Sequence, residues 1–160
     1  MNPERLRLHA ERGEMIPEAP VRASAATTID APVKAVWSIM TDVPQWPTWY
    51  PYLKNAELRG EFVPGSDLRY GGLVKHRLTV AAVEPQVMAT VCGQMLIYDG
   101  ITRWDFTATG ARTRVEFTES SSGFLLGAVY NEKALRKHLE EWLAALKVRA
   151  ERDGVRAGDQ

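Results

Sequence analysis

Hydrophobic residues recur with helical spacing in the C-terminal part of the chain. Within residues 124–149, Leu135, Leu139, Trp142 and Leu146 follow one another at steps of four and three residues, which places them on one face of an α-helix. The charged side chains of this segment occupy the opposite face: Glu132, Lys133, Arg136, Lys137, Glu140 and Glu141. A helix of this length, roughly 40 Å at ~1.5 Å per residue, needs a surface on which to bury its apolar stripe.

Before residue 124 the hydrophobic period changes from that of a helix to that of a strand. Residues 21–29 are small and β-tolerant, and six further strands are expected at 55–62, 67–73, 74–83, 87–97, 101–108 and 112–120. Short turn signals such as Pro64-Gly65 and Asp99-Gly100 separate these runs, which favours an antiparallel meander. Such a sheet has one face that the long helix can cover.

Two short helices are expected between the first and second strands. Asp30 stands where a helix N-cap belongs, and apolar residues follow at helical spacing, which predicts a helix at 31–40. Three prolines at 44, 47 and 51 limit the next segment to a short helix or turn that Asp42 can cap.

The chain is expected to form one domain at residues 21–150. We interpret residues 1–20 as a mobile leader, or as a short peripheral helix at 4–12, outside the core. Residues 151–160 are expected to be a disordered tail.

Composition narrows the classes of function. Twenty basic and twenty acidic residues give a formal net charge of zero, so no electrostatic footprint for nucleic acid is visible. Cys92 lies in an apolar run and is expected to pack as a small buried hydrophobe. The N-terminus lacks the apolar core of a secretion signal, and no run approaches the ~18 apolar residues of a membrane span. A cytoplasmic protein is therefore expected, as a monomer or a homodimer.

The order of elements and the segment IDAPVKAVWSIMTDVPQWPTWYP carry a family resemblance. The matching positions are Ala31, Pro32, Val36, Trp37, Asp42, Trp46, Pro47, Trp49 and Pro51, with Leu58, Gly60, Glu61, Gly65, Trp104 and Thr113 to Val115 further along. Over residues 21–150 the chain resembles the polyketide cyclase/dehydrase-like (SRPBCC) family of the START and birch-pollen-allergen-like helix-grip superfamily.

The resemblance implies an α+β helix-grip fold. In this fold a seven-stranded curved antiparallel sheet wraps around the long C-terminal helix, with two short helices between strands 1 and 2. The family typically leaves an apolar cavity between sheet and helix, and its members bind, carry or cyclise hydrophobic, lipid- or polyketide-like molecules.

Strand alternation indicates which side chains reach such a cavity. In the last strand Thr113, Val115, Phe117 and Glu119 should face the helix, and His76 should share an apolar face with Leu78. The expected cavity residues are Trp46, Trp49, Tyr50, Tyr70, Leu78, Tyr98, Trp104, Phe117, Leu126, Tyr130 and Asn131. The segment 124–131 is apolar on nearly all sides, and we expect it to line the pocket, although a helix start covered by loops is the alternative.

Three functions remain open from the sequence. The first is a binder or carrier of a hydrophobic small molecule. The second is a cyclase or dehydratase in which His76 and Glu119 form a buried acid–base pair, although each can equally be a structural or solvated residue. The third is a protein-binding domain that presents the sheet or the aromatic segment to another protein, which an exposed patch of Trp46, Trp49 and Tyr50 would favour. No cofactor and no metal site is expected, because His9, His76 and His138 lack metal-ligand spacing.

Overall fold

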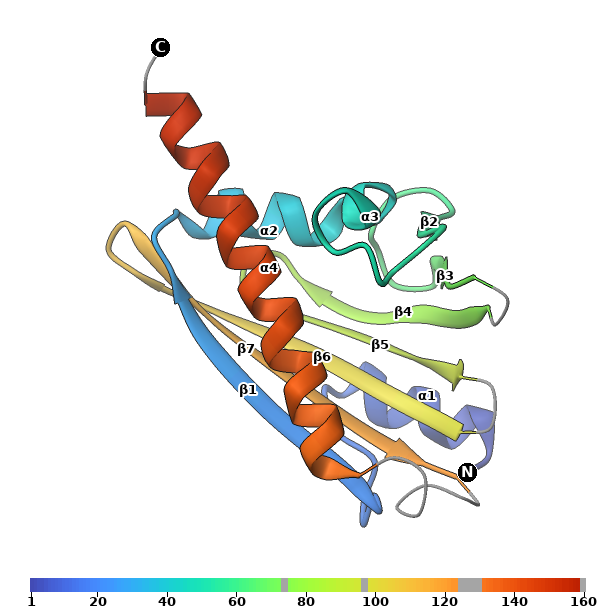
Figure 1. Cartoon of the computed structure of the whole chain (residues 1–160). Coiled ribbons are helices and arrows are strands. Elements are labelled where there is room, and N and C mark those ends of the chain that lie inside the picture. The colour runs from blue at the N-terminus through green and yellow to red at the C-terminus, as the bar shows by residue number, and fades with distance from the viewer. Residues whose placement is uncertain (73–74, 96–97, 124–130, 159–160) are drawn as a thin grey trace.

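A single antiparallel sheet wraps around one long helix (Figure 1). The structure is a computed structural model that describes residues 1–72, 75–95, 98–123 and 131–158. Its elements are α1 (Pro3–Glu11), β1 (Val21–Ile29), α2 (Val33–Thr41), a 3-10 turn η1 (Val43–Gln45), α3 (Trp46–Trp49), β2 (Glu57–Leu58), β3 (Asp67–Tyr70), β4 (His76–Glu84), β5 (Met88–Met95), β6 (Tyr98–Thr109), β7 (Arg112–Ser122) and α4 (Glu132–Gly158).

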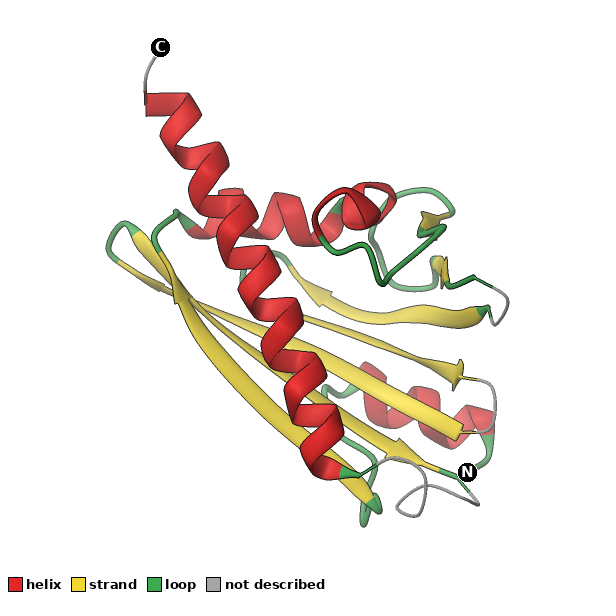
Figure 2. Cartoon of the chain, viewed as in Figure 1, coloured by secondary structure: helices red, strands yellow, loops and turns green. Residues whose placement is uncertain are grey.

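The seven strands lie in the order β1-β7-β6-β5-β4-β3-β2, and every neighbouring pair is antiparallel. Strands β2 to β7 form the expected meander, and β1 closes the sheet by pairing with β7. Helix α4 crosses the concave face, and α2 and α3 cover one end of the sheet (Figure 2). The predicted helix-grip fold class is confirmed.

The apolar stripe of α4 forms the centre of the core. Leu135, Leu139, Trp142 and Leu146 are each at most 2% exposed. Helix α4 begins at Glu132, where the side chain of Asn131 accepts a hydrogen bond from the backbone N–H of Ala134 at 3.0 Å. Residues 124–130 of the predicted helix lie outside the described residues. At its other end α4 continues to Gly158, so residues 151–158 are helical and not the disordered tail that was expected.

Alternation along β7 follows the prediction. Thr113, Val115, Phe117 and Glu119 are all buried on the face toward α4. Strand β6 departs from simple alternation because Ile101, on the opposite face, is also buried. Something must therefore cover the outer face of the sheet.

That cover is α1, which packs outside β4, β5 and β6 (Figure 1). Leu6, Ala10 and Ile16 form a second apolar cluster with Ala81, Cys92 and Ile101 of the sheet. The hydroxyl of Thr90 donates to the carbonyl of Ala10 at 2.7 Å, and the Arg103 guanidinium donates to the carbonyl of Gly13 at 2.6 Å. Of the two interpretations of residues 1–20, the structure contains the short helix, as a third layer with a core of its own. Cys92 is buried as expected, and burial raises the pKa of its thiol to about 11.

The segment between β1 and β3 differs from the sequence prediction in two details. The N-cap of α2 is Pro32 and not Asp30, because the chain stays extended through Pro32 (ψ 148°) and turns helical only at Val33. The strands predicted at 55–62 and 67–73 shrink to two and four residues. Gly60 and Gly65, both with positive φ, bend the chain between them.

Among the described residues, no helix combines the length and the apolar character needed to span a membrane.

Candidate functional site

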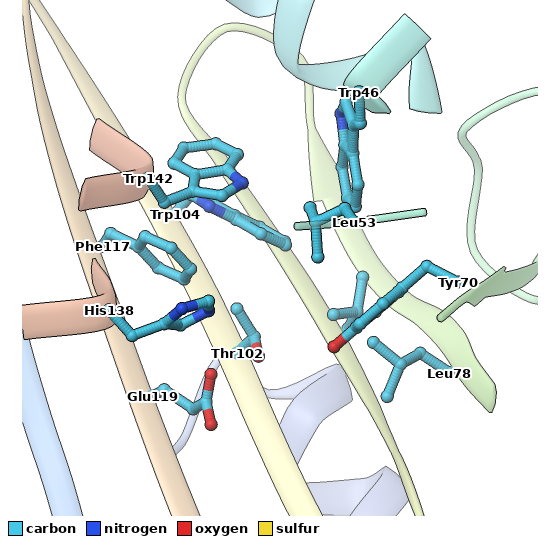
Figure 3. Close-up of a pocket in the computed structure, with 11 residues that line it drawn as sticks. Trp46, Leu53, Tyr70, Leu78, Thr102, Trp104, Phe117, Glu119, His138 and Trp142 are labelled. Carbon is cyan, nitrogen blue, oxygen red and sulfur yellow. The ribbon is translucent and has the colours of Figure 1, made fainter. Parts of the chain in front are cut away.

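A small cavity lies between the concave face of the sheet, α4 and the segment that follows α2 (Figure 3). Its lining residues are Trp46, Leu53, Tyr70, Leu78, Val91, Thr102, Trp104, Phe117, Glu119, His138 and Trp142. The volume is about 30 Å³, which is room for roughly two water molecules.

Aromatic rings form one wall of the cavity. Trp104 stacks on Phe117 with ring centroids 5.2 Å apart, and Trp142 meets Phe117 edge-on at 4.9 Å. Trp46 packs against Trp142 at 6.3 Å, and its indole N–H donates to the carbonyl of Met40 at 2.9 Å. Such ring pairs contribute about 0.5–1.5 kcal/mol each beyond area burial. This wall is therefore rigid, and its faces can accept a planar apolar group.

Trp104 adds an unused donor to this wall. The residue is 3% exposed, and its indole N–H is buried with no hydrogen-bond partner among the described residues. A buried donor without a partner costs stability. The cost is offset when a bound molecule supplies an acceptor.

Glu119 is the acidic group of the cavity. Its position on β7 opposite Thr102 of β6 aims the side chain inward, where it is 8% exposed. The Ser121 hydroxyl donates to its carboxylate at 3.2 Å. Burial raises the pKa of Glu119 to about 7, against the smaller opposing effect of hydrogen bonds from Ser121 and Thr102. The carboxyl group therefore changes between its protonated and ionised forms close to neutral pH.

His138 supplies a second titratable side chain from α4. Its Nδ1 lies 3.2 Å from the Tyr50 hydroxyl, and its ring points into the cavity above Glu119 (Figure 3). Burial lowers the pKa of His138, and the nearby Glu141 partly opposes this effect. At neutral pH the ring is therefore uncharged and can either accept or donate a hydrogen bond.

His138 was not among the predicted site residues, although its position in the sequence carried a signal. It lies three residues after Leu135 and four before Trp142, which is on the apolar stripe of α4 and not on its charged face. A polar residue at such a position points toward the core. The other lining residues that the prediction missed are Leu53, Val91, Thr102 and Trp142.

His76 does not line the cavity, and no hydrogen bond or ion pair joins it to Glu119 in the described part of the chain. Glu119 is in register with Thr102, Val91 and Val80 on successive strands, and His76 lies four residues before Val80. At ~4.8 Å per strand and ~3.3 Å per residue, the two backbones are roughly 20 Å apart along the sheet. The predicted His76–Glu119 pair is therefore not formed.

The imidazole of His76 instead stacks on Tyr70, with ring centroids 4.8 Å apart and planes 24° apart. Burial lowers the pKa of His76, and its Nδ1 is buried with no hydrogen-bond partner among the described residues.

The structure divides the predicted cavity residues into three groups. Those that line the cavity are Trp46, Tyr70, Leu78, Trp104 and Phe117. Those that are described but do not line it are Trp49, Tyr50, Tyr98 and Asn131. Leu126 and Tyr130 lie outside the described residues.

The four that do not line the cavity have other positions. Trp49 is half-buried and packs on Trp142. It also lines an outer groove, together with Thr48, Ala144, Ala145, Val148, Arg149 and Arg152. Tyr50 is buried behind His138. Tyr98 lies near the site, since burial and the negative charge of Glu119 raise its pKa to about 12. Asn131 is exposed and caps α4. Because Trp46 and Tyr50 are each only 3% exposed, the exposed patch of Trp46, Trp49 and Tyr50 that would favour a protein-binding function is not formed.

The described residues contain no group of three His, Cys, Asp or Glu side chains that could hold a metal ion. The chemistry available in the cavity is that of a rigid aromatic wall, the hydroxyls of Tyr70 and Thr102, a carboxyl and an imidazole.

Solved structures with the same fold come from several bacteria. A START superfamily protein from Mycobacterium smegmatis is 18% identical, with a TM-score of 0.71, and the match covers 82% of this chain and 97% of that one. A hypothetical protein from Helicobacter pylori is 15% identical, with a TM-score of 0.72 and coverage of 84% and 91%. A protein from Thermus thermophilus is 17% identical, with a TM-score of 0.66 and coverage of 81% and 96%. At these identities the likeness establishes the fold alone.

No curated protein matches the chain in sequence. Residues 20–151 match the family described as polyketide cyclase / dehydrase and lipid transport. This match covers the sheet, the cavity and most of α4, and the chain therefore belongs to that family.

Proposed function

We propose that this protein binds a hydrophobic small molecule between the sheet and α4, and that Glu119 hydrogen-bonds the polar group of that ligand. The observation that carries the proposal is the pairing of a rigid aromatic wall with a buried carboxyl group in one cavity. Apolar walls with a few convergent polar groups are typical of small-molecule sites. The family, whose description includes lipid transport, supports the same class of ligand.

The cavity is too small to hold a ligand unless some of its side chains move. About 30 Å³ is far below the roughly 300–1,000 Å³ of typical ligand pockets. Trp104, Phe117 and Trp142 are held by mutual packing, whereas Leu53 belongs to an irregular segment and Tyr70 is only partly buried. Ligand binding therefore requires Leu53 and Tyr70 to move away from the aromatic wall.

Two measurements test the binding function. Mass spectrometry of gently purified protein should detect a co-purifying hydrophobic molecule. Titration with the neutral probe N-phenyl-1-naphthylamine should quench the tryptophan fluorescence, since Trp46, Trp104 and Trp142 all line the cavity. No co-purifying molecule and no saturable quenching would refute the proposal.

A pair of variants locates the binding. Leu78→Phe places a larger side chain in the cavity wall and should weaken probe binding at least tenfold. Thr107→Phe adds the same ring at an exposed position of β6 and should leave it unchanged. Equal affinities of the two variants would place the probe outside the cavity.

A second candidate function is catalysis of a cyclisation or dehydration, with Glu119 as the general acid or base. The observation in its favour is the pKa of about 7, because a proton-transferring group works best when its pKa is near the working pH. Here the second acid–base group of the cavity is His138 and not His76.

A turnover assay with a poly-β-ketone thioester tests this second function. Glu119→Gln should abolish turnover while binding persists. Binding of that substrate without turnover by the unaltered protein would refute catalysis.

A further inference from the structure

Strand β1 lies at one end of the strand order, so one of its two sides has no neighbouring strand (Figure 1). We call this side the open edge of β1. The strand is nine residues long, its only charged side chain is Arg22, and Ala26 and Thr28 are exposed. A long edge with small, uncharged side chains is a template for pairing with another strand, and proteins usually protect such edges. The open edge of β1 therefore requires a partner or a cover.

Two cations of α4 bond the backbone of this edge. The Arg136 guanidinium donates to the carbonyl of Ser24 at 2.8 Å. The Lys147 ammonium donates to the carbonyl of Thr28. Ala26 lies between these two residues and directs its own N–H and carbonyl to the same side, because alternate residues of a strand point their backbone groups the same way. The side chains of α4 therefore occupy two of the acceptors that an added strand would need.

The spacing of the α4 side chains matches the spacing of the strand. Arg136, Lys147 and Glu151 are separated by eleven and four residues, close to three turns and one turn, and so lie on one side of α4. Glu151 accepts a hydrogen bond from the N–H of Asp30 at 2.9 Å and pairs with Lys147 at 3.0 Å. From residue 136 to 151 the helix spans about 22 Å, and from residue 24 to 30 the strand spans about 20 Å. One row of α4 side chains therefore follows the open edge.

The open edge also matches a second copy of itself. In an antiparallel pair centred on Ala26, Ser24 of one chain faces Thr28 of the other, and the two residues exchange backbone hydrogen bonds. The carbonyls that α4 occupies are the acceptors of those bonds. The same register places the exposed Arg22 opposite the exposed Asp30 of the second copy, and opposite charges stabilise a cross-strand pair. Such a pair is symmetric and closes as a dimer.

We propose that the open edge of β1 is a pairing surface for a second copy of this chain, and that Arg136 and Lys147 keep it closed. The two side chains compete with the second strand for the same carbonyl oxygens. The unaltered protein is then monomeric, and loss of the two cations makes the edge available. This inference is independent of the proposed ligand, because none of the residues that it uses lines the cavity.

Sedimentation equilibrium of two matched double variants tests the proposal. Arg136→Ala/Lys147→Ala should form a dimer as its concentration rises, whereas the unaltered protein should stay monomeric. Both changes lie on the surface of a helix that alanine favours, so the fold should be retained. The control Lys133→Ala/Lys137→Ala also removes two positive charges from the exposed face of α4, away from the open edge, and should stay monomeric. A folded Arg136→Ala/Lys147→Ala variant that stays monomeric would overturn the proposal, and so would a dimer of the unaltered protein.

Amide hydrogen exchange locates the contact between the two copies. The N–H groups of Ser24, Ala26 and Thr28 face the open edge, so they should exchange rapidly in the unaltered protein and become protected in the dimer of the variant. Ala26→Pro, added to that variant, removes the central donor where the N–H faces solvent, and should restore the monomer without preventing folding. The single variants Arg136→Ala and Lys147→Ala should dimerise more weakly, and they provide the same test if the double variant does not fold. A dimer in which these three amides still exchange rapidly, or one that persists with Ala26→Pro, would overturn the proposal.

Discussion

Replacement of Glu119 by glutamine should change how the stability of the protein depends on pH. The folded protein raises the pKa of this carboxyl group from 4.5 to about 7, chiefly by burial. Between these two values the folded state holds a proton that the unfolded chain has lost. The stability that Glu119 contributes is therefore fully present below pH ~4.5 and is lost as the pH rises through about 7.

The size of the effect follows from the same shift. At 1.36 kcal/mol per pKa unit, full ionisation costs about 3 kcal/mol of folding free energy. Glutamine cannot ionise and can keep the hydrogen bond from Ser121. Relative to the unaltered protein, Glu119→Gln should be of similar stability at pH ~4.5 and about 3 kcal/mol more stable at pH ~8.5.

Urea unfolding at several pH values between about 4.5 and 8.5 measures this difference directly. All other titrating groups are common to both proteins, so the difference between the two unfolding free energies isolates Glu119. Glu140→Gln, on the exposed side of α4, controls for the loss of one negative charge. A difference that stays constant over this pH range would refute the burial of an ionisable Glu119 in the cavity.

Two further predictions concern the fold around the site. Leu139→Ala, at a fully buried position of the α4 stripe, should lower the unfolding free energy by about 2–5 kcal/mol, whereas Lys137→Ala on the charged face should change it by less than about 0.5 kcal/mol. Gly93→Ala should destabilise by about 1–3 kcal/mol, because the added Cβ would lie 2.2 Å from the backbone oxygen of Arg77. Gly154→Ala, which meets nothing within 4 Å in the helical α4, should instead stabilise by about 1 kcal/mol. Unfolding curves of the four variants check both predictions, and equal effects of the two glycine replacements would contradict the second.

Local periodicity was sufficient to predict the architecture. The steps from Leu135 to Leu146 identified the covering helix, and alternation along β7 placed Phe117 and Glu119 on its inner face. Both depend only on the geometry of a single element. The short helix near the N-terminus was one of two interpretations, but its packing on the outer face of the sheet was not predicted. The sheet residues that it covers, Ala81, Cys92 and Ile101, look like ordinary strand hydrophobes in the sequence.

The site was predicted less completely, because it depends on distances between strands. Alternation assigns His76 and Glu119 to inward faces, but it contains no information on how far apart their strands lie in the sheet order. The alternation of apolar residues also does not reveal register shifts, such as the one between Val80 and Ala82. His138 was missed for a different reason: the sequence interpretation considered it only as a metal ligand and did not use its position on the apolar stripe of α4.

The central claim is that a hydrophobic molecule binds between the aromatic wall and Glu119. Intermolecular NOEs between N-phenyl-1-naphthylamine and the protein test it most directly. We predict NOEs from the probe to the ring protons of Trp104, Phe117 and Trp142. NOEs confined to the outer groove beside Trp49 and Val148, or no NOE at saturating probe, would contradict the account.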